Sequence, residues 1–556
     1  MFNLFNKQNI RGDILGGITA AIVSLPLALT FGVASGLGPE AGLYGALLVG
    51  LFAAIFGGTP TLISEPTGPM TVLMTAVIAS FIAADPENGV AMAFTVVMMA
   101  GVFQILFGAL KLGKYITLMP YSVVSGFMSG IGCILIIMQL APALGQSSPS
   151  GGVIGTLGNL PDIFANISIA EFSLFVATLA LLFLTPSKIT RIIPAQLIAL
   201  VFITLASIYF IDGADIRRIG EVSVSLPELV LPTFTASQWQ RMVVEAAVLG
   251  MLGCIDSMLT SVIADNLTRT EHKSNKELIG QGLGNLISGL FGGLPGAGAT
   301  MGTVVNIQAG ARTAWSGVTR VVVLAVAIFG AASLISVIPL AVLAGIAVKV
   351  GVDILDWSFI KRAHRVSWQS TLIMYSVLTL TVLVDLMVAV GIGLFVANII
   401  IIEKLSRSQS QQIKAISDMD DELPLNKAER ELLNQGKGKI LYFYLSGPMI
   451  FGVSKALARE RSSIENHDSI IIDLSDVSLI DDTISLSIEN MILESLDANK
   501  QVCVIYQLEA NKSKLCGMSD GQLSEEMFVR SREQALLRAN EYLLRHGNVS
   551  EASLQA

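Results

Sequence analysis

The sequence predicts a polytopic α-helical membrane protein that ends in a small α/β domain. Of its 556 residues, 53% are hydrophobic and only 14% are charged, whereas soluble domains carry roughly 25% charged residues. The charge deficit is confined to the chain before about residue 404, and the remainder has ordinary polarity. The expected domains are therefore a transmembrane region at 1–404, a linker with a short helix at 405–437 and an α/β domain at 438–556.

Fourteen apolar segments approach the length of about 20 residues that a membrane span needs. They divide the transmembrane region into two halves of seven, at about 1–235 and 236–404. The candidate spans are 12–31, 40–57, 67–83, 89–110, 118–143, 169–186, 194–211, 238–264, 277–291, 298–310, 314–335, 338–354, 367–385 and 387–403.

The distribution of basic residues orients these spans. Lys and Arg mark cytoplasmic loops, and a cytoplasmic N-terminus places most basic loops on the inside. The exception is an outer loop that carries Arg217 and Arg218. Fourteen crossings return the chain to the cytoplasm at Lys404, so the sequence predicts a multi-pass inner (plasma) membrane protein whose N-terminus and tail are cytoplasmic. Membrane lipid is then its immediate partner.

Two segments of this apolar region have broken helical patterns. The first is LISEPTGPMTV from Leu62, and the second is GGLPGAGATMGTVV from Gly292. Each is rich in Gly or Pro, then becomes helical, and each forms the third span of its half. Because irregular backbone is tolerated in a membrane only inside protein or beside a water-filled cavity, the pair predicts an inverted repeat with discontinuous helices.

Two helices that begin within the membrane would direct their N-termini at a common point. Free N–H groups and the positive end of the helix dipole attract anions there. Thr67 adds a hydroxyl at the first N-terminus, while Gly298, Ala299 and Thr300 shape the second. The alternative interpretation is that both breaks are kinks that serve packing alone.

The eighth span carries an acidic residue, Asp256, near its middle. A charge in this position costs at least ~2.5–3.5 kcal/mol, so it usually faces a cavity or a partner. Thr260 lies one helical turn further, on the same face. A carboxylate, a hydroxyl and backbone carbonyls together form an oxygen-rich set of ligands, which suits a hard cation such as Na+. Alternatively, Asp256 carries a proton or is a structural carboxylate. Glu245 is expected in a vestibule or in packing, and Glu65 as a structural or gating residue.

The tail alternates strand and helix patterns, which predicts a small α/β domain. SIIIDLSDVSLI and QVCVIYQL have the character of buried strands, and ISLSIENMILESLDA has a helical period. Thr483 is expected to act as a helix N-cap.

Other functional classes lack support in the sequence. The four cysteines have neither metal-ligand spacing nor a disulfide framework, and the four histidines form no zinc motif. No basic stripe with interleaved aromatic residues indicates nucleic-acid binding. We therefore expect no enzyme, no nucleic-acid partner and no metal besides Na+.

Several long motifs identify the family. IRGDILGGITAAIVSLPLALTFGVASG, FGGTPTLISEPTGPMTV and NIQAGART resemble the sulfate-permease (SulP) anion transporters, over nearly the whole chain. CIDSMLTSVIADNLTRTEHKSNKELIGQGLGN resembles the bicarbonate-transporting cyanobacterial members of that family. The resemblance implies a uracil-permease-like fold with core and gate domains, in which half-helices form spans 3 and 10. It also implies Na+-dependent bicarbonate symport by an elevator movement, serving carbon concentration.

The resemblance also implies a ligand set. Na+ would bind at Asp256, Thr260 and Thr300 and the backbone of Gly298, and bicarbonate between Thr67 and the backbone of Gly298 and Ala299. The alternatives within the family are a symporter for sulfate or another small anion, coupled to H+ or Na+, and an anion channel.

Two departures from the family pattern bear on function. Many relatives carry an arginine in the tenth span where this chain has Gly302, so a bound Na+ would supply the missing positive charge. The tail resembles a STAS domain, which in this family forms a homodimer and tunes transport. Asp482 stands where signalling relatives carry a phosphorylatable serine, so phosphorylation there is not expected.

Overall fold

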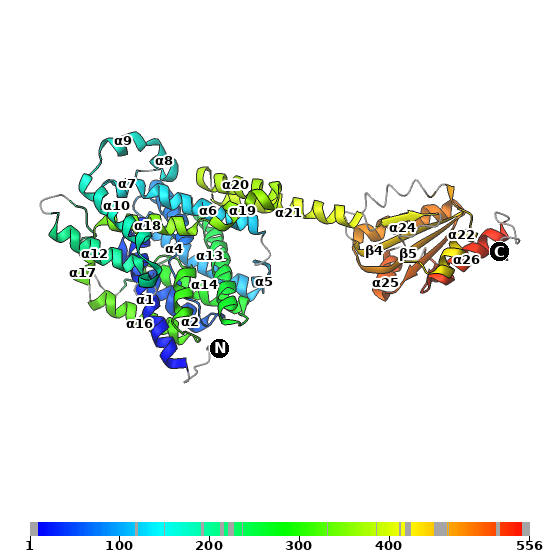
Figure 1. The fold of residues 1–556 in the computed structure, drawn as a ribbon, viewed down its shortest axis with the longest axis horizontal. Helices are drawn as coiled ribbons and strands as arrows, with labels where there is room; N and C mark the ends of the chain where they lie inside the picture. The colour runs from blue at the N-terminus through cyan, green and yellow to red at the C-terminus, as the bar shows by residue number, and fades with distance from the viewer. Residues whose placement is uncertain are drawn as a thin grey trace. The chain divides into compact units, whose positions relative to one another are not determined.

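The computed structural model describes residues 9–546 except 117–119, 150, 191–193, 212–215, 221–226, 236, 331, 385, 411–412, 418–423, 450–463, 465 and 519–522. The chain divides into two compact units, Met1–Ala397 and Asn398–Ala556 (Figure 1). The first unit is helical, and the second is built around a sheet.

Every predicted span overlaps a helix of the first unit. Its elements are α1 (Ile10–Ala34), α2 (Pro39–Phe56), β1 (Ser64–Glu65), α3 (Gly68–Ala84), α4 (Gly89–Ala109), α5 (Gly113–Ile116), α6 (Tyr121–Met138), α7 (Leu140–Ala143), α8 (Gly152–Gly158), α9 (Leu160–Ala165), α10 (Ile169–Leu184), α11 (Ser187–Thr190), α12 (Ala195–Tyr209), α13 (Trp239–Thr268), α14 (Ser274–Leu290), β2 (Ala297–Gly298), α15 (Thr300–Gln308), α16 (Trp315–Gly330), α17 (Ala332–Ser336), α18 (Leu340–Ile354), α19 (Trp357–Val366), α20 (Trp368–Leu383) and α21 (Leu386–Ser410). Among the described residues, five helices have the length and composition to cross a membrane, and five more are shorter and apolar.

The helices of this unit pack as two groups. Helices α1, α2, α4, α13, α14 and α16 contact one another with the short α3 and α15, and α6, α10, α12, α18 and α20 form the second group. Small residues allow close packing within a group. A Cβ added to Gly101 on α4 would lie 2.5 Å from the backbone oxygen of Gly282 on α14, and the reverse distance is the same. The two groups meet where α1 and α3 pack against α18 and α6.

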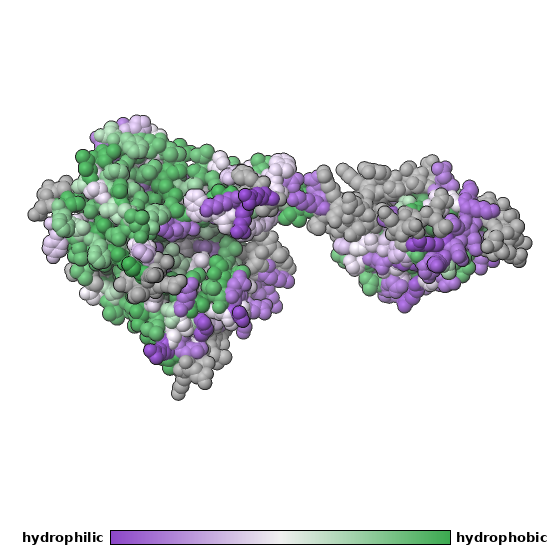
Figure 2. Space-filling model, in the orientation of Figure 1, coloured by the Kyte–Doolittle hydropathy of each residue, from purple (hydrophilic) through white to green (hydrophobic). Residues whose placement is uncertain are grey.

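The outer surface of the helical unit is apolar. Large exposed side chains include Phe172, Phe183, Phe202, Val322 and Phe395, and Figure 2 shows hydrophobic residues over most of the visible face of this unit. Such a surface would be unfavourable in water. It is the surface expected of helices that face lipid.

The predicted outer loop with two arginines is tied to the helices. The Arg217 guanidinium forms an ion pair with the buried carboxylate of Glu171 at 2.8 Å. Arg218 donates a hydrogen bond to the Ser207 hydroxyl at 3.2 Å. The charge of Arg217 is therefore paired, and Arg218 is held by neutral oxygens.

The second unit is a five-stranded sheet with helices on both faces. Its elements are β3 (Ile413–Ile416), α22 (Lys427–Gln435), β4 (Ile440–Met449), β5 (Ser469–Ile480), α24 (Asp482–Asp497), β6 (Gln501–Tyr506), α25 (Glu509–Met518), η4 (Glu525–Met527), β7 (Phe528–Val529) and α26 (Arg532–Arg545). The strand order is β3-β4-β5-β6-β7. β3 is antiparallel to β4, and the remaining neighbours are parallel.

Alternating side chains of the central strands build two separate cores. Phe443 and Ile472 face one side, where α24 and α25 pack. Tyr442, Ile471 and Cys503 face the other side, where α22 and α26 pack. Side chains alternate between the two faces of the sheet, and helices cover both faces. Both sets of side chains are therefore mostly apolar, which gives the continuous hydrophobic runs in the sequence.

Two details of the tail differ from the expectation. The segment 405–437, expected as a linker with a short helix, has that helix as α22, which packs on α26. It also contains β3, which was not expected and pairs with β4 in register from Ile413 to Ile416. A four-residue strand is too short for its pattern to stand out, and it forms because the edge of β4 can pair with it. The N-cap of α24 is Asp481 and not Thr483, because the Asp481 carboxylate accepts the Ile484 N–H at 2.8 Å.

Candidate functional site

The two broken segments meet as a pair of crossing strands. β1 and β2 pair antiparallel, with Ser64 opposite Gly298 and Glu65 opposite Ala297. α3 begins at Gly68, three residues after the end of β1, and α15 begins at Thr300, two residues after the end of β2. Because the two strands are antiparallel, the helices leave the crossing in opposite senses. The predicted change from extended chain to helix is thus confirmed in both segments. The first N–H groups of each helix lack intrahelical partners and lie at the crossing.

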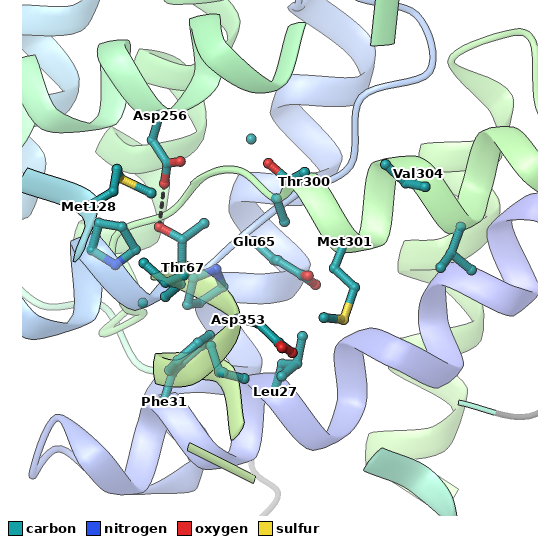
Figure 3. A pocket seen from close by; sticks show the side chains of 18 residues that line it. Leu27, Phe31, Glu65, Thr67, Met128, Asp256, Thr300, Met301, Val304 and Asp353 are labelled. Carbon is teal, nitrogen blue, oxygen red and sulfur yellow. Dashed lines mark hydrogen bonds between the residues drawn. The ribbon is translucent and has the colours of Figure 1, made fainter. Parts of the chain in front are cut away.

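Asp256 lies beside this crossing, on α13. Its side chain is buried, and the Thr67 hydroxyl donates a hydrogen bond to its Oδ2 at 2.8 Å, shown in Figure 3. Thr67 is the N-cap of α3, yet its side chain does not cap its own helix. The hydroxyl instead joins the first half-helix to the carboxylate of the eighth span, which sequence spacing alone did not indicate.

Thr260 extends the same face of α13 toward the second half-helix. Its hydroxyl donates to the Gly298 carbonyl at 2.8 Å and lies 2.9 Å from the Thr300 hydroxyl. The structure therefore brings together all six predicted site residues. Their oxygens come from one carboxylate, hydroxyls and a backbone carbonyl, which is a set of ligands that hard cations accept.

Polar side chains buried around the crossing fix its backbone. Ser257 accepts the Gly298 N–H at 3.0 Å, and Thr303 accepts the Ile63 N–H at 3.0 Å. Asn285 bonds both the N–H and the carbonyl of Gly296. Because a buried backbone polar group is costly when unpaired, these partners hold an otherwise unfavourable extended chain within the helical unit.

A buried ion pair lies beside the crossing. The Arg320 guanidinium on α16 contacts Glu65 Oε2 at 2.5 Å, and both side chains are at most 2% exposed. Arg320 also donates to the Ser24 hydroxyl and to the carbonyls of Ala46 and Ser64. Sequence reasoning named Glu65 but missed Arg320. The available signal was an arginine in the middle of a candidate span, which calls for a partner.

The crossing and Asp256 border a cavity of about 390 Å³. The crossing, Asp256 and α15 form one wall, and residues of α6 and α18, including Met128, Val350 and Asp353, form the opposite wall. The cavity therefore lies between the two helix groups (Figure 3). Thr67, Gly298, Ala299 and Thr300 line it directly, whereas Thr260 acts through its hydrogen bonds to two of them.

The charges around the cavity do not all cancel. Glu65 is neutralised by Arg320, and Asp353 forms an ion pair with Lys349 at 2.5 Å. Within the part of the chain that the structure describes, Asp256 has no ion-pair partner. The site thus carries one uncompensated carboxylate next to two helix N-termini. The sequence led us to expect no fixed positive charge near the site, because Gly302 replaces an arginine of many relatives. Arg320 provides such a charge beside the crossing, but Glu65 cancels it.

A helical membrane unit with a cavity between two helix groups, and with two half-helices that end at a buried carboxylate, has the architecture of a secondary transporter. The model of the sulfate permease family matches residues 10–377. The chain belongs to the sulfate permease family, so it is a membrane transporter and not an enzyme.

Individual relatives agree with this assignment. The chain is 59% identical to a bicarbonate transporter, BicA, of Picosynechococcus sp., over 97% of this chain and 96% of that protein. It is 64% identical to the solved transmembrane domain of a cyanobacterial bicarbonate transporter BicA, with a TM-score of 0.67, over 70% of this chain and 100% of that chain.

A more distant structure extends the likeness into the tail. The murine anion transporter Slc26a9, solved in the inward-facing state, aligns with a TM-score of 0.82 over 97% of this chain and 92% of that chain. Its sequence identity is 18%, so it establishes the shared fold alone.

Proposed function

We propose that the protein is a symporter that takes up bicarbonate together with Na+. The observation that carries the proposal is the hydrogen bond between Thr67 at the start of one half-helix and Asp256, beside the start of the other. The extensive identity to bicarbonate transporters supports the choice of substrate.

The cation would bind on the α13 side of the crossing. Asp256, the hydroxyls of Thr260 and Thr300, and the carbonyl of Gly298 supply oxygen ligands in one small region. Na+ there would replace the hydrogen bonds that now join Thr260 to its two neighbours. It would also compensate the Asp256 charge, whose burial is otherwise costly.

The anion would bind between the two helix N-termini. Thr67 and the backbone of Gly298 and Ala299 line the cavity, and the dipoles of α3 and α15 each favour a negative charge by roughly 0.3–1 kcal/mol. Against an uncompensated Asp256, these dipoles do not suffice to hold a lone anion. With Na+ bound, the carboxylate and the cation cancel, and this gives a physical reason for coupled transport.

We further propose fourteen crossings arranged as two inverted repeats of seven. The antiparallel pairing of β1 with β2 and the opposite senses of α3 and α15 support this arrangement. The helix group that carries the site would act as the core and the group of α6 and α18 as the gate. Translation of the core past the gate, in an elevator movement, would expose the cavity to either side of the membrane.

The tail is proposed to be a cytoplasmic STAS domain through which two chains form a homodimer. Its mixed sheet with helices on both faces supports the domain assignment. Placement in the plasma membrane with both the N-terminus and the tail inside follows the distribution of basic loops. Crosslinking of the full-length protein in membranes tests the dimer, and a chain that stays monomeric would refute it.

Uptake of labelled bicarbonate into proteoliposomes tests the function, with and without external Na+ at fixed pH and membrane potential. Saturable uptake that requires Na+ is the expected result. Uptake that depends on a proton gradient and not on Na+ would make Asp256 a proton site. Transport of sulfate in place of bicarbonate, or flux without coupling or saturation, would refute the substrate or make the protein a channel.

A further inference from the structure

One buried oxygen at the cavity has no partner in the described structure. Glu65 is 2% exposed and lines the cavity. Its Oε2 accepts a hydrogen bond from Arg320, but its Oε1 is buried without a hydrogen-bond partner. Figure 3 shows the carboxylate on the side of the cavity where Met301 lies. Buried polar atoms are nearly always satisfied, so an exception at a cavity needs an explanation.

Glu65 belongs to an ion pair whose net charge is close to zero. Arg320 neutralises the carboxylate, and Arg320 is itself fixed by Ser24 and by the backbone carbonyls of Ala46 and Ser64. A carboxylate in this state does not repel an anion as a free charge would. Its unpartnered oxygen remains a strong acceptor for a donor inside the cavity.

No side chain of residue 302 reaches this oxygen, because residue 302 is a glycine and even a Cβ there would fit only tightly. A Cβ added to Gly302 would lie 3.4 Å from Glu65 Oε1 and 3.1 Å from Ile63 Cγ2. Even a small polar side chain at 302 would therefore reach Oε1 and satisfy it. Glycine leaves that role to a donor that enters the cavity.

We propose that Glu65 Oε1 accepts a hydrogen bond from the hydroxyl of bound bicarbonate, and so selects a protonated oxyanion; this inference rests on the proposed function. Bicarbonate has two oxygens that only accept hydrogen bonds and one O–H that donates. The helix N-termini and Thr67 supply donors, and Glu65 supplies the matching acceptor. Nitrate has the same planar shape and single negative charge but no donor, so it would place a lone pair against Oε1.

Discrimination of this kind is strong when a site contains a buried group that only the correct substrate satisfies. A hydrogen bond to a charged acceptor corresponds to a preference of roughly 10- to 100-fold. The wild-type protein should therefore bind bicarbonate in preference to nitrate by at least this factor. The preference is measured as the ratio between the inhibition constant of nitrate and the KM of bicarbonate, at saturating Na+.

Gly302→Ser and Gly302→Ala form the matched test pair, in the full-length protein in proteoliposomes. Both add the same Cβ, but only serine adds a hydroxyl that can donate to Glu65 Oε1 and occupy it. Gly302→Ser should lower the preference ratio by about tenfold or more, while Gly302→Ala should retain the wild-type ratio. The ion pair between Glu65 and Arg320 stays intact in both variants.

Glu65→Gln provides a second test through the acceptor itself. Its neutral amide oxygen is a weaker acceptor, so the ratio should again fall toward one. The change also leaves the buried Arg320 charge without its partner, so total uptake should fall and the ratio is measured on the uptake that remains. Equal ratios for Gly302→Ser and Gly302→Ala, or an unchanged ratio in Glu65→Gln, would overturn the inference. Absence of Na+-dependent bicarbonate uptake in the wild-type protein would be a different result, and it would refute the proposed function.

Discussion

Replacing Arg320 by methionine should destabilise the helical unit and abolish uptake. The ion pair with Glu65 is buried on both sides, and Arg320 makes three further hydrogen bonds. Methionine fills much of the volume but leaves the Glu65 charge uncompensated. Breaking a buried pair by removing one partner costs about 3–5 kcal/mol. The cavity would also carry two uncompensated carboxylates, which repel the anion.

Thermal unfolding of the purified protein in detergent measures the first effect. For a unit of this size, the loss corresponds to a fall in apparent melting temperature of roughly 4–6 °C. The double variant Glu65→Gln/Arg320→Met removes both charges and should recover most of the stability, because a buried pair replaced as a whole is often nearly neutral.

Lys349→Met is the matched control for this prediction. It breaks the ion pair with Asp353, which is partly exposed and worth about 1 kcal/mol or less, so its melting temperature should stay close to that of the wild type. The reasoning is refuted if Arg320→Met has the same melting temperature as the wild type, or if the double variant has a melting temperature as low as that of Arg320→Met.

Three further predictions concern other groups. Asp256→Asn should abolish Na+-dependent bicarbonate uptake, whereas Glu245→Gln on the same helix, whose carboxylate pairs with Arg241 at 3.8 Å, should retain it; equal uptake by the two variants would contradict this. Burial acts to raise the pKa of Asp356, the N-cap of α19, but hydrogen bonds from Tyr121, Ser125 and the Phe359 N–H outweigh burial and lower that pKa. The lowered pKa means that this carboxylate stabilises α19 above about pH 4 and loses the effect as the pH falls further. Asp356→Ala should therefore speed hydrogen exchange of α19 amides at pH 7, by an amount matching about 1 kcal/mol. Unchanged exchange would contradict a capping role for Asp356. Burial raises the pKa of the Cys503 thiol to about 11, so its thiolate fraction at pH 8 is on the order of 10⁻³; a maleimide should label it much faster in urea than in the folded protein, and equal rates would show that the thiol is accessible.

The backbone of the site could be predicted because its local sequence is unusual. Pro66, Gly68 and Pro69 interrupt an apolar region where a broken helix is tolerated only inside protein or beside a water-filled cavity, and the structure has β1 followed by α3 at that place. The same reasoning located β2 and α15. Asp256 was identified because a carboxylate in the middle of a span is costly.

The partners of these groups could not be predicted, because they come from distant parts of the chain. The bond from Thr67 to Asp256 spans 189 residues, and that from Arg320 to Glu65 spans 255. No periodicity in the sequence encodes which side chains meet across two half-helices. The orphaned Oε1 of Glu65 likewise depends on the path of β1 and on the absent side chain at Gly302.

The tail shows the same division between local and distant information. The hydrophobic runs of β5 and β6 predicted both strands, since each is buried on two faces. The N-cap was misplaced by two residues, because Asp481 and Thr483 are both acceptable caps and only the backbone conformation decides between them.

The central claim is that Na+ and bicarbonate bind together at the crossing of the two half-helices, and uptake of radiolabelled Na+ tests it most directly. Each ion should strengthen the binding of the other, because coupled binding is reciprocal. Since symport moves both ions in one step, bicarbonate should also stimulate Na+ uptake into proteoliposomes. The account predicts saturable, bicarbonate-dependent Na+ uptake by the wild-type protein and none by Asp256→Ala. Na+ uptake that ignores bicarbonate, or that persists unchanged in Asp256→Ala, would contradict it.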